Sequence, residues 1–154
     1  MTERSVRPAQ PGDEGQVAAM MALLWPDGAV VEFRRETTAL VATGMCGTLP
    51  AVILVAVDED GALTGFLQAG LRSHADGCDV AQPVGYVEGW FVQERARGRG
   101  VGRTLMQAAE DWARAHGCVE MASDALIDNA GSQRAHDALG FEVVDRCVHL
   151  RKGL

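Results

Sequence analysis

The chain has 154 residues, 47% of them hydrophobic, so we expect one domain over residues 1–154 that buries a core without metals or disulfides. Its 21 acidic and 14 basic residues give a net charge of -7, which argues against nucleic-acid binding and favours a cationic ligand. No stretch has the length and hydrophobicity of a membrane span, and MTERSVRPAQ at the N-terminus lacks a signal-peptide core, so we expect a cytoplasmic protein without membrane contact. Four scattered cysteines without a C-x-x-C pair indicate buried free thiols rather than a zinc site or disulfides.

The first half of the chain changes from a helical to a strand pattern. Apolar residues at helical spacing predict one helix within residues 11–25, ended by a Trp-Pro-Asp-Gly turn, and a second helix over residues 30–43. Residues 51–73 predict two strands joined by an Asp-Glu-Asp-Gly turn, the pattern of a β-hairpin, and residues 84–92 predict a third strand. This half therefore supplies two helices followed by three strands.

The second half predicts helix, strand, helix and strand in turn. Residues 100–116 carry apolar side chains on one helical face and are followed by a closing glycine. The segment CVEMASD (118–124) indicates a short buried strand, DNAGSQRAHDAL (128–139) a helix, and FEVVDRCVHL (141–150) a final strand. This order predicts an α/β (α+β) fold with a mixed central sheet flanked by helices.

The segment RARGRGVGRTL (95–105) joins the third strand to the following helix and combines four arginines with three glycines. Backbone N–H groups at a helix N-terminus bind phosphate where no side chain blocks the approach. A P-loop would need Lys and then Ser or Thr after Gly102, where Arg103-Thr104 stands, and a dinucleotide fingerprint would need glycine at 103 or 105. Neither motif matches this segment. If the segment does not bind phosphate, its arginines are an ordinary run of solvated charges.

The pattern R-x-x-G-x-G does fit, with Arg97, Gly100 and Gly102. Together with DNAGSQRAHDALGFEVV (128–144), an asparagine followed by a helix that ends in Leu-Gly-Phe, it resembles the GCN5-related N-acetyltransferase (GNAT) superfamily. The resemblance implies a GNAT-like fold, acetyl-CoA as co-substrate without a metal, and a loop that binds the CoA pyrophosphate through backbone N–H groups of residues 97–103. The cofactor-binding residues are then Trp90, Phe91, Val92, Arg97, Gly98, Arg99, Gly100, Val101, Gly102, Arg103 and Asn129.

Four segments resemble, within that superfamily, the aminoglycoside 6'-N-acetyltransferases of the chromosomal type. They are LWP (24–26), PVGYVEGWFV (83–92), EMASDALIDNAGSQRAHDALGF (120–141) and the basic end HLRKGL (149–154). The likeness is dense from Pro83 onward and thin before it. It implies acetylation of the 6'-amino group of aminoglycoside antibiotics and, typically, a homodimer, for which the final strand is free to associate.

Glu88 lies in the middle of a strand, where a carboxylate is costly unless it faces a polar cleft. Its neighbour Gly89 can produce a bulge that opens the strand, so we interpret Glu88 as the group that holds the substrate ammonium and takes its proton through water. The alternative is a side chain on an exposed strand face. Backbone groups of residues 90–92 would line the pantetheine arm and offer the oxyanion donor.

Three more residues are candidates for the acceptor site or for proton transfer. Asp124 ends a strand, where crevices of open α/β sheets lie, and is interpreted as an acceptor-amine contact, with a turn cap as the alternative. His136 stands where many GNAT members have a tyrosine that protonates the thiolate, and its alternative is a half-buried polar residue. Asp145, in the final strand, stands where the aminoglycoside enzymes tend to have an acidic contact, and is equally well an exposed carboxylate.

Trp25 matches the substrate-wall residue of the aminoglycoside enzymes through LWP, with core packing as the alternative. The segment before Pro83 lacks the aromatic residue of related enzymes and offers His74 instead. That departure leaves open a second hypothesis, an acetyltransferase of the same fold acting on a polyamine, peptide or metabolite amine. A third is a non-catalytic acyl-CoA-binding module, in which Glu88 and Asp124 would be accidental.

Overall fold

The computed structural model describes residues 5–154; residues 1–4, the start of the stretch without a signal-peptide core, lie outside the described part. The helices are α1 (Glu14–Leu24), α2 (Val30–Thr43), the 3-10 helix η1 (Glu94–Ala96), α3 (Val101–Ala115) and α4 (Ala130–Asp137). The strands are β1 (Ser5–Pro8), β2 (Met45–Cys46), β3 (Leu49–Val57), β4 (Leu63–Arg72), β5 (Val84–Val92) and β6 (Met121–Ser123). Within residues 5–154, no helix combines the length and hydrophobicity needed to cross a membrane.

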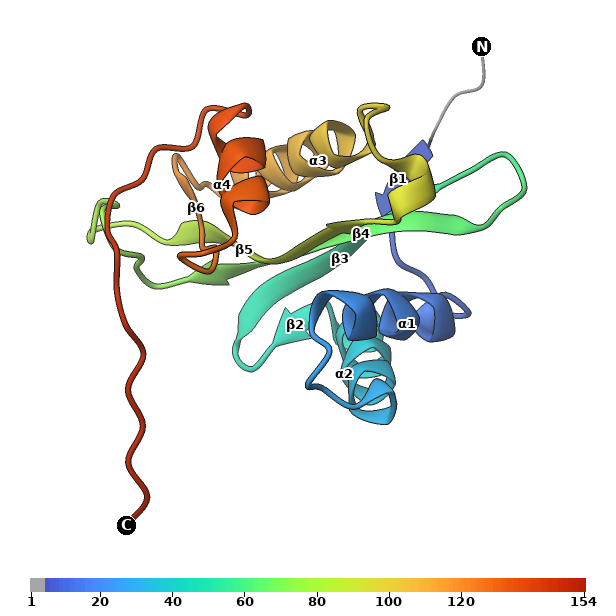
Figure 1. The fold of residues 1–154 in the computed structure, drawn as a ribbon, viewed down its shortest axis with the longest axis horizontal. Helices are drawn as coiled ribbons and strands as arrows, with labels where there is room; N and C mark the ends of the chain where they lie inside the picture. Colours follow the sequence, from blue (N-terminus) through green and yellow to red (C-terminus); the bar gives the residue numbers. More distant parts are fainter. Residues whose placement is uncertain (1–4) are drawn as a thin grey trace.

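Six strands form a mixed sheet in the order β1-β3-β4-β5-β6, with β2 pairing to β3 (Figure 1). The pairs from β1 to β5 are antiparallel, and β5 and β6 are parallel. A tight turn joins β3 to β4, where Asp58 accepts hydrogen bonds from the N–H groups of Asp60 (2.9 Å) and Ala62 (3.0 Å). The parallel pair needs a crossover, which α3 provides. The predicted α/β fold with a mixed sheet is confirmed.

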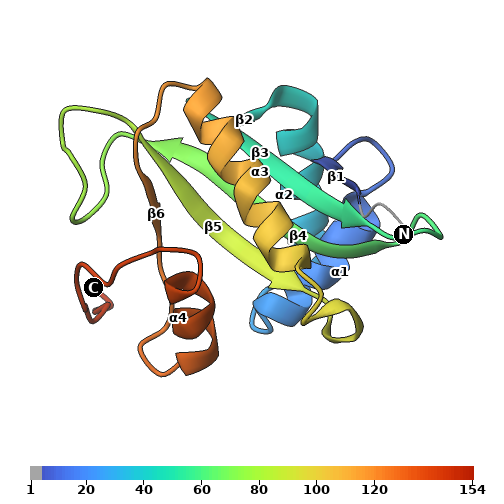
Figure 2. The ribbon, with the colours of Figure 1, turned by 90° about the horizontal axis from the view of Figure 1, so that it is seen from above.

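Helices cover both faces of the sheet (Figures 1 and 2). α1 and α2 pack on one face, around a core that includes Met20, Ile53 and Phe66, and α3 packs on the other, around a core that includes Leu67 and Leu105. Side chains of a strand alternate between the two faces, so consecutive residues of β4 enter different cores. This burial from both sides explains the nearly continuous apolar runs of β3 and β4.

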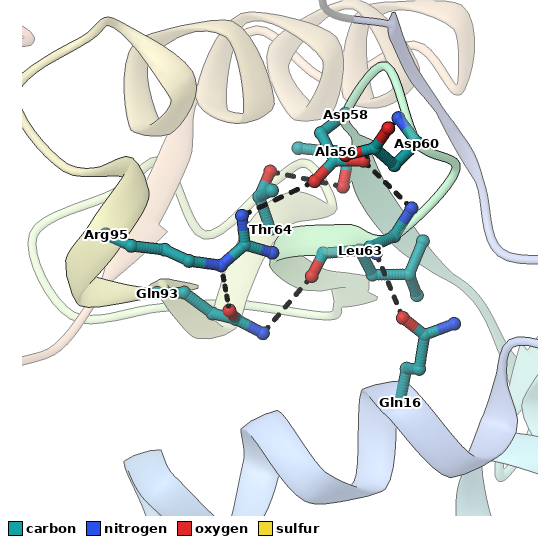
Figure 3. A network of polar contacts seen from close by, with 9 residues as sticks. Gln16, Ala56, Asp58, Asp60, Leu63, Thr64, Gln93 and Arg95 are labelled. Atoms are coloured by element: carbon teal, nitrogen blue, oxygen red, sulfur yellow. Dashed lines mark hydrogen bonds and ion pairs between the residues drawn. The ribbon is translucent and has the colours of Figure 1, made fainter.

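A network of polar contacts fixes the segment between β5 and α3 (Figure 3). Arg95 forms an ion pair with Asp58 (3.4 Å), and its Nε donates to Gln93 Oε1 (3.1 Å). The Gln93 side chain donates to the carbonyl of Leu63 (3.2 Å), whose N–H donates to Gln16 Oε1 on α1 (3.0 Å). These bonds tie the β3–β4 turn and α1 to η1, so the chain enters the glycine-rich loop from a fixed position.

The short strand β1 has no counterpart among the predicted elements. It pairs with β3, and Arg7 on β1 forms an ion pair with the buried Asp13 at the start of α1 (2.7 Å). The hydrogen bond from Arg7 holds the pKa of Asp13 below its usual value. Four residues, of which only the two middle ones are half-buried, are too few to produce a distinct strand pattern in the sequence.

The prediction of a final strand in FEVVDRCVHL is wrong. Residues 142–154, here called the C-terminal tail, contain neither helix nor strand. Val144 lies close to Gly77 in the β4–β5 loop, and the chain end extends away from the sheet in Figure 1. The segment has strand-forming residues, but a strand also needs a hydrogen-bonding neighbour, and its own domain provides none along this path. The thiol prediction is right only for Cys118, which is buried, since Cys46 and Cys147 are exposed and Cys78 is half-buried.

Candidate active site

The loop before α3 leaves the N-terminal end of that helix open. Gly98 and Gly100 have positive φ values of 72° and 83°, and Gly100 is the N-cap. The first hydrogen bond of the helix joins Thr104 N–H to the Gly100 carbonyl (3.0 Å), so the N–H groups of residues 101–103 point out of the helix end. A Cβ atom on Gly98 or Gly100 would meet no heavy atom of residues 5–154 within 4 Å, so it is the left-handed backbone that favours glycine.

Two of the four arginines in this segment turn back toward the domain. Arg95 belongs to the network of Figure 3, and Arg97 Nε donates to the carbonyl of Val92 (2.8 Å). The backbone N–H of Arg97 donates to the Glu94 carbonyl (3.2 Å), so one N–H of the predicted pyrophosphate cradle is used within η1. The candidate N–H groups for a phosphate are therefore those of Gly98 and of residues 101–103.

Strands β5 and β6 separate after three residue pairs. Gly85 to Val87 pair with Met121 to Ser123, whereas β5 continues to Val92. β4 occupies one edge of residues 89–92, and no other described strand pairs with the opposite edge. Trp90 Nε1 donates to the Gly102 carbonyl (3.2 Å), which fixes this part of β5 to the first turn of α3. The pantetheine arm and the oxyanion donor are predicted from the sequence to lie along this edge.

His136 lies between two aromatic rings and uses both of its nitrogen atoms. Its ring centroid is 5.2 Å from those of Trp90 and Phe141. Nδ1 lies 2.7 Å from the Ser132 carbonyl, which can only accept, so Nδ1 carries a hydrogen. In the neutral ring Nε2 then accepts from Ser123 Oγ (2.7 Å). Neutral His136 is therefore oriented as an acceptor at Nε2, and only the protonated ring donates there.

Glu88 is the extra residue of a β-bulge. Gln68 on β4 pairs with Gly89 and Ala69 pairs with Val87, so Glu88 has no opposite residue on β4. The bulge predicted from Gly89 is confirmed. The Glu88 side chain, 35% exposed, lines a cavity of about 220 Å³. The other residues of the cavity wall are Cys46, Pro50, Ala51, Gln68, Ala69, Gly70 and Leu71.

Glu88 and Asp124 are joined through two residues absent from the sequence-based site. Arg72 donates Nε to Glu88 Oε1 (3.0 Å) and Nη2 to Glu88 Oε2 (2.9 Å), and its guanidinium lies 3.5 Å from the Tyr86 ring centroid. The Tyr86 hydroxyl donates to Asp124 Oδ2 (2.9 Å). Burial, and then this hydrogen bond, raise the pKa of Tyr86 to about 12, so the hydroxyl stays protonated at neutral pH.

Trp25 both packs in the core and lies beside Glu88. Its ring centroid is 5.8 Å from that of Phe33 and 6.2 Å from that of Phe66. A Cβ atom on Gly89 would lie 2.6 Å from Trp25 Cη2, so the ring covers the backbone next to Glu88. Glycine at 89 therefore provides the space for Trp25 as well as the bulge. The structure is compatible with both interpretations of this tryptophan.

The remaining candidates occupy different environments. Asn129 caps α4, since its Oδ1 accepts from Ser132 N–H (3.0 Å). His74 is exposed, 3.3 Å from Ser73 Oγ. Asp145 lies in the C-terminal tail rather than in a strand, accepts from Arg146 N–H (2.7 Å), and is outside the hydrogen-bonded cluster of Glu88 and Asp124. Within residues 5–154, no cluster of three or more His, Cys, Asp or Glu side chains could hold a metal ion.

Arg72, Tyr86 and Ser123 are not recognisable as site residues from the sequence, because their contacts depend on strand register and on tertiary packing. Arg72 pairs with Val84, which makes it a diagonal neighbour of Tyr86 on the same face of the sheet. Ser123 reaches His136 only because β6 and α4 pack together. Two signals in the sequence could have indicated this cluster. They are an arginine at the end of one strand and, in the next strand, a tyrosine two residues before Glu88.

A CoA-dependent acyltransferase needs N–H groups for phosphate, a free strand edge and carboxylates for an amine. The described residues provide an open helix N-terminus, a part of β5 that no described strand pairs on one side, and the carboxylates of Glu88 and Asp124. Comparison with known proteins supports this class. The chain belongs to the Acetyltransferase (GNAT) family, which matches residues 15–141. The resemblance stated from the sequence is confirmed.

Two relatives align over nearly the whole chain. The aminoglycoside N(6')-acetyltransferase type 1 of Klebsiella aerogenes is 39% identical over 149 residues, 97% of this chain and 96% of that protein. The protein of the same name from Stenotrophomonas maltophilia is 35% identical over 97% of this chain and 94% of its own length. The homology thus extends to the half of the chain before Pro83, where the sequence motifs were thin.

Solved structures of similar proteins have the same fold. AAC(6')-Iy in complex with the bisubstrate analog CoA-S-monomethyl-acetylneamine has a TM-score of 0.88 and 29% identity, covering 99% of this chain and 100% of that one. The aminoglycoside 6'-N-acetyltransferase AAC(6')-Ih from Acinetobacter baumannii has a TM-score of 0.85 and 30% identity, covering 99% of both chains. The predicted GNAT-like architecture is confirmed.

Proposed function

We propose that this protein transfers the acetyl group of acetyl-CoA to the 6'-amino group of aminoglycoside antibiotics, and so confers resistance. The observation that carries the proposal is full-length similarity to aminoglycoside N(6')-acetyltransferases. The cluster of Glu88 and Asp124 supports it, since aminoglycosides carry several ammonium groups that an acidic crevice attracts. The net charge of -7 adds a favourable long-range field.

The described groups support direct transfer. Acetyl-CoA supplies the acetyl thioester; the neutral amine attacks its carbonyl carbon, the C–S bond breaks, and the amine loses a proton. Glu88 would orient the amine and take that proton through water, and N–H groups of residues 90–92 would stabilise the oxyanion. Gly98 and the N–H groups that follow it would bind the pyrophosphate. Protonated His136 would protonate the departing thiolate of CoA, with Ser123 Oγ relaying the proton.

We further infer that residues 1–154 act as one N-acetyltransferase domain in the cytoplasm, without a nucleic-acid, membrane or metal partner. The family match over residues 15–141 and the acidic charge support this assignment.

Release of the CoA thiol in the presence of amines tests the activity. We expect kanamycin or tobramycin to release CoA from acetyl-CoA, and an analogue with a 6'-hydroxyl group to be a much poorer acceptor, because a hydroxyl is a weaker nucleophile. Salt should raise KM for the acceptor, since it screens the carboxylates. Purified protein without aminoglycoside-dependent thiol release, or equal acetylation of the 6'-hydroxyl analogue at another amine, would overturn the proposal.

We also propose that the protein is a homodimer assembled through the C-terminal tail. The tail exposes large hydrophobic side chains and has a strand-forming sequence, but it forms no strand within its own chain over residues 142–154. A second copy would provide the missing hydrogen-bonding partner. The exposed hydrophobic residues are Val143, Val144, Val148, Leu150 and Leu154.

Light scattering on two double variants tests this assembly. We expect the wild type to have twice the 16.4 kDa mass of one chain, and Val148→Asp with Leu150→Asp to be monomeric, because two buried unpaired carboxylates would oppose the interface. The control Val31→Asp with Val119→Asp replaces two equally exposed valines outside the tail and should remain dimeric. A monomeric wild type, or a tail variant that remains dimeric, would refute the proposal.

A further inference from the structure

Arg72 is held beside Glu88 by contacts to two residues of β5. Its guanidinium makes two parallel hydrogen bonds with Glu88 (3.0 and 2.9 Å) and stacks on the ring of Tyr86 (3.5 Å). Such a fork-to-carboxylate arrangement fixes the plane of both groups, which a lysine cannot do. Tyr86 is in turn fixed by its hydrogen bond to Asp124. Although the Arg72 side chain is 45% exposed and that of Glu88 35%, the paired hydrogen bonds and the ring stacking hold the guanidinium in one orientation.

The ion pair leaves Glu88 able to accept further hydrogen bonds. A carboxylate has about four lone-pair sites, and the guanidinium takes one on each oxygen. The Glu88 side chain is 35% exposed and lines the cavity beside β4, so its remaining lone pairs can reach a ligand. Arg72 thus orients Glu88 toward an amine without blocking it.

The cluster also has a defined charge. Glu88 and Asp124 contribute two negative charges and Arg72 one positive charge. Tyr86 is neutral at neutral pH, as a tyrosine ordinarily is, and burial raises its pKa further, to about 12. The net value of one negative charge can bind a single ammonium group. Other titratable groups lie on neighbouring segments. Cys46 lines the same cavity, His74, Asp76, Cys78 and Asp79 lie in the loop after Arg72, and Glu120 and Asp128 lie on either side of β6 and Asp124.

This charge matters because only a neutral amine attacks a thioester. Two unpaired carboxylates would raise the pKa of a bound amine, so that less of the amine would be in the neutral, nucleophilic form at neutral pH. A guanidinium fixed beside one of them offsets that effect, while Asp124 still attracts the cationic substrate. Negative charge favours binding of the cationic substrate but lowers the fraction of neutral amine. The positive charge of Arg72 reduces the second effect.

We propose that Arg72 is the charge-balancing and positioning residue of the acceptor site, which orients Glu88 and favours the neutral form of the acceptor amine. The inference rests on the proposed aminoglycoside acetylation and names a residue that sets its pH range. Arg72 does not touch the reacting atoms and acts through Glu88 and through the local field.

The pH dependence of turnover tests this inference with Arg72→Gln and Arg72→Lys. For Arg72→Gln we expect KM for kanamycin to fall by roughly threefold, since the site becomes more negative. In the pH profile, kcat rises as the amine becomes neutral, and we expect the midpoint of this rise to move up by about one pH unit. Arg72→Lys keeps the charge but loses the fork and the ring stacking, so its midpoint should stay near that of the wild type while kcat falls. If Arg72→Gln does not fold, Arg72→Met serves in its place, because it also removes the positive charge.

The outcomes separate this inference from the proposed function. A wild type that acetylates kanamycin, with unchanged midpoints in both Arg72→Gln and Arg72→Met, overturns the role of Arg72 alone and shows a structural role. An Arg72→Lys midpoint displaced as far as that of the neutral variants overturns it as well. A wild type that neither binds nor acetylates kanamycin overturns the proposed function, and this inference with it.

Discussion

Replacing Gly100 by valine should weaken acetyl-CoA binding by about 100-fold, the loss expected when two hydrogen bonds from backbone N–H groups to a charged phosphate are broken. Gly100 has φ of 83°, which a β-branched residue adopts only with strain, so the loop backbone would shift. The new side chain would also project into the open space at the start of α3, where the phosphate has to approach. Isothermal titration calorimetry with acetyl-CoA measures the change.

Gly117→Val is the matched control at the other end of the same helix. Gly117 also has φ of 83°, and a Cβ atom there would likewise meet no described heavy atom within 4 Å. Both variants should therefore lose similar thermal stability, whereas only Gly100→Val should lose acetyl-CoA affinity. Equal affinity in Gly100→Val and the wild type would refute the assignment of the loop and leave the fold unchanged.

The elements that could be predicted from the sequence are those whose pattern is local. The apolar spacing of residues 30–43 and 84–92 predicted α2 and β5 at their observed bounds. The glycine-rich loop was recognisable because positive φ and close ligand approach both restrict the residue type, independently of tertiary contacts. The bulge at Glu88 was predictable for the same reason, from the glycine that follows it.

The elements that could not be predicted depend on partners distant in sequence. The pairing of Arg72 with Glu88 follows from the register of β4 against β5, which a single sequence does not define. The segment FEVVDRCVHL has the residues of a strand, but whether it forms one is decided by a neighbouring strand edge. The interpretation of Asp145 as an acidic contact rests on the family resemblance and on a final strand that this chain does not form over residues 142–154.

Replacing Glu88 by glutamine should lower kcat for aminoglycoside acetylation by about 100-fold, the low end of the range for general base catalysis. Glutamine keeps the size of the side chain but cannot accept a proton from the amine. It would also leave the Arg72 guanidinium without its carboxylate, so the crevice would repel an ammonium group and KM should rise too. Steady-state kinetics with kanamycin and acetyl-CoA separate the two effects.

Asp124→Asn and Glu32→Gln make this measurement specific. Asp124 attracts the acceptor but is not assigned a proton-transfer step, so its variant should raise KM with a smaller change in kcat. Asparagine can still accept the Tyr86 hydrogen bond, which keeps the cluster in place. Glu32 on α2 is also ion-paired with an arginine, Arg35, and its replacement should leave both constants unchanged. If Glu88→Gln retains the kcat of the wild type, proton transfer does not pass through Glu88, and the amine must lose its proton directly to solvent.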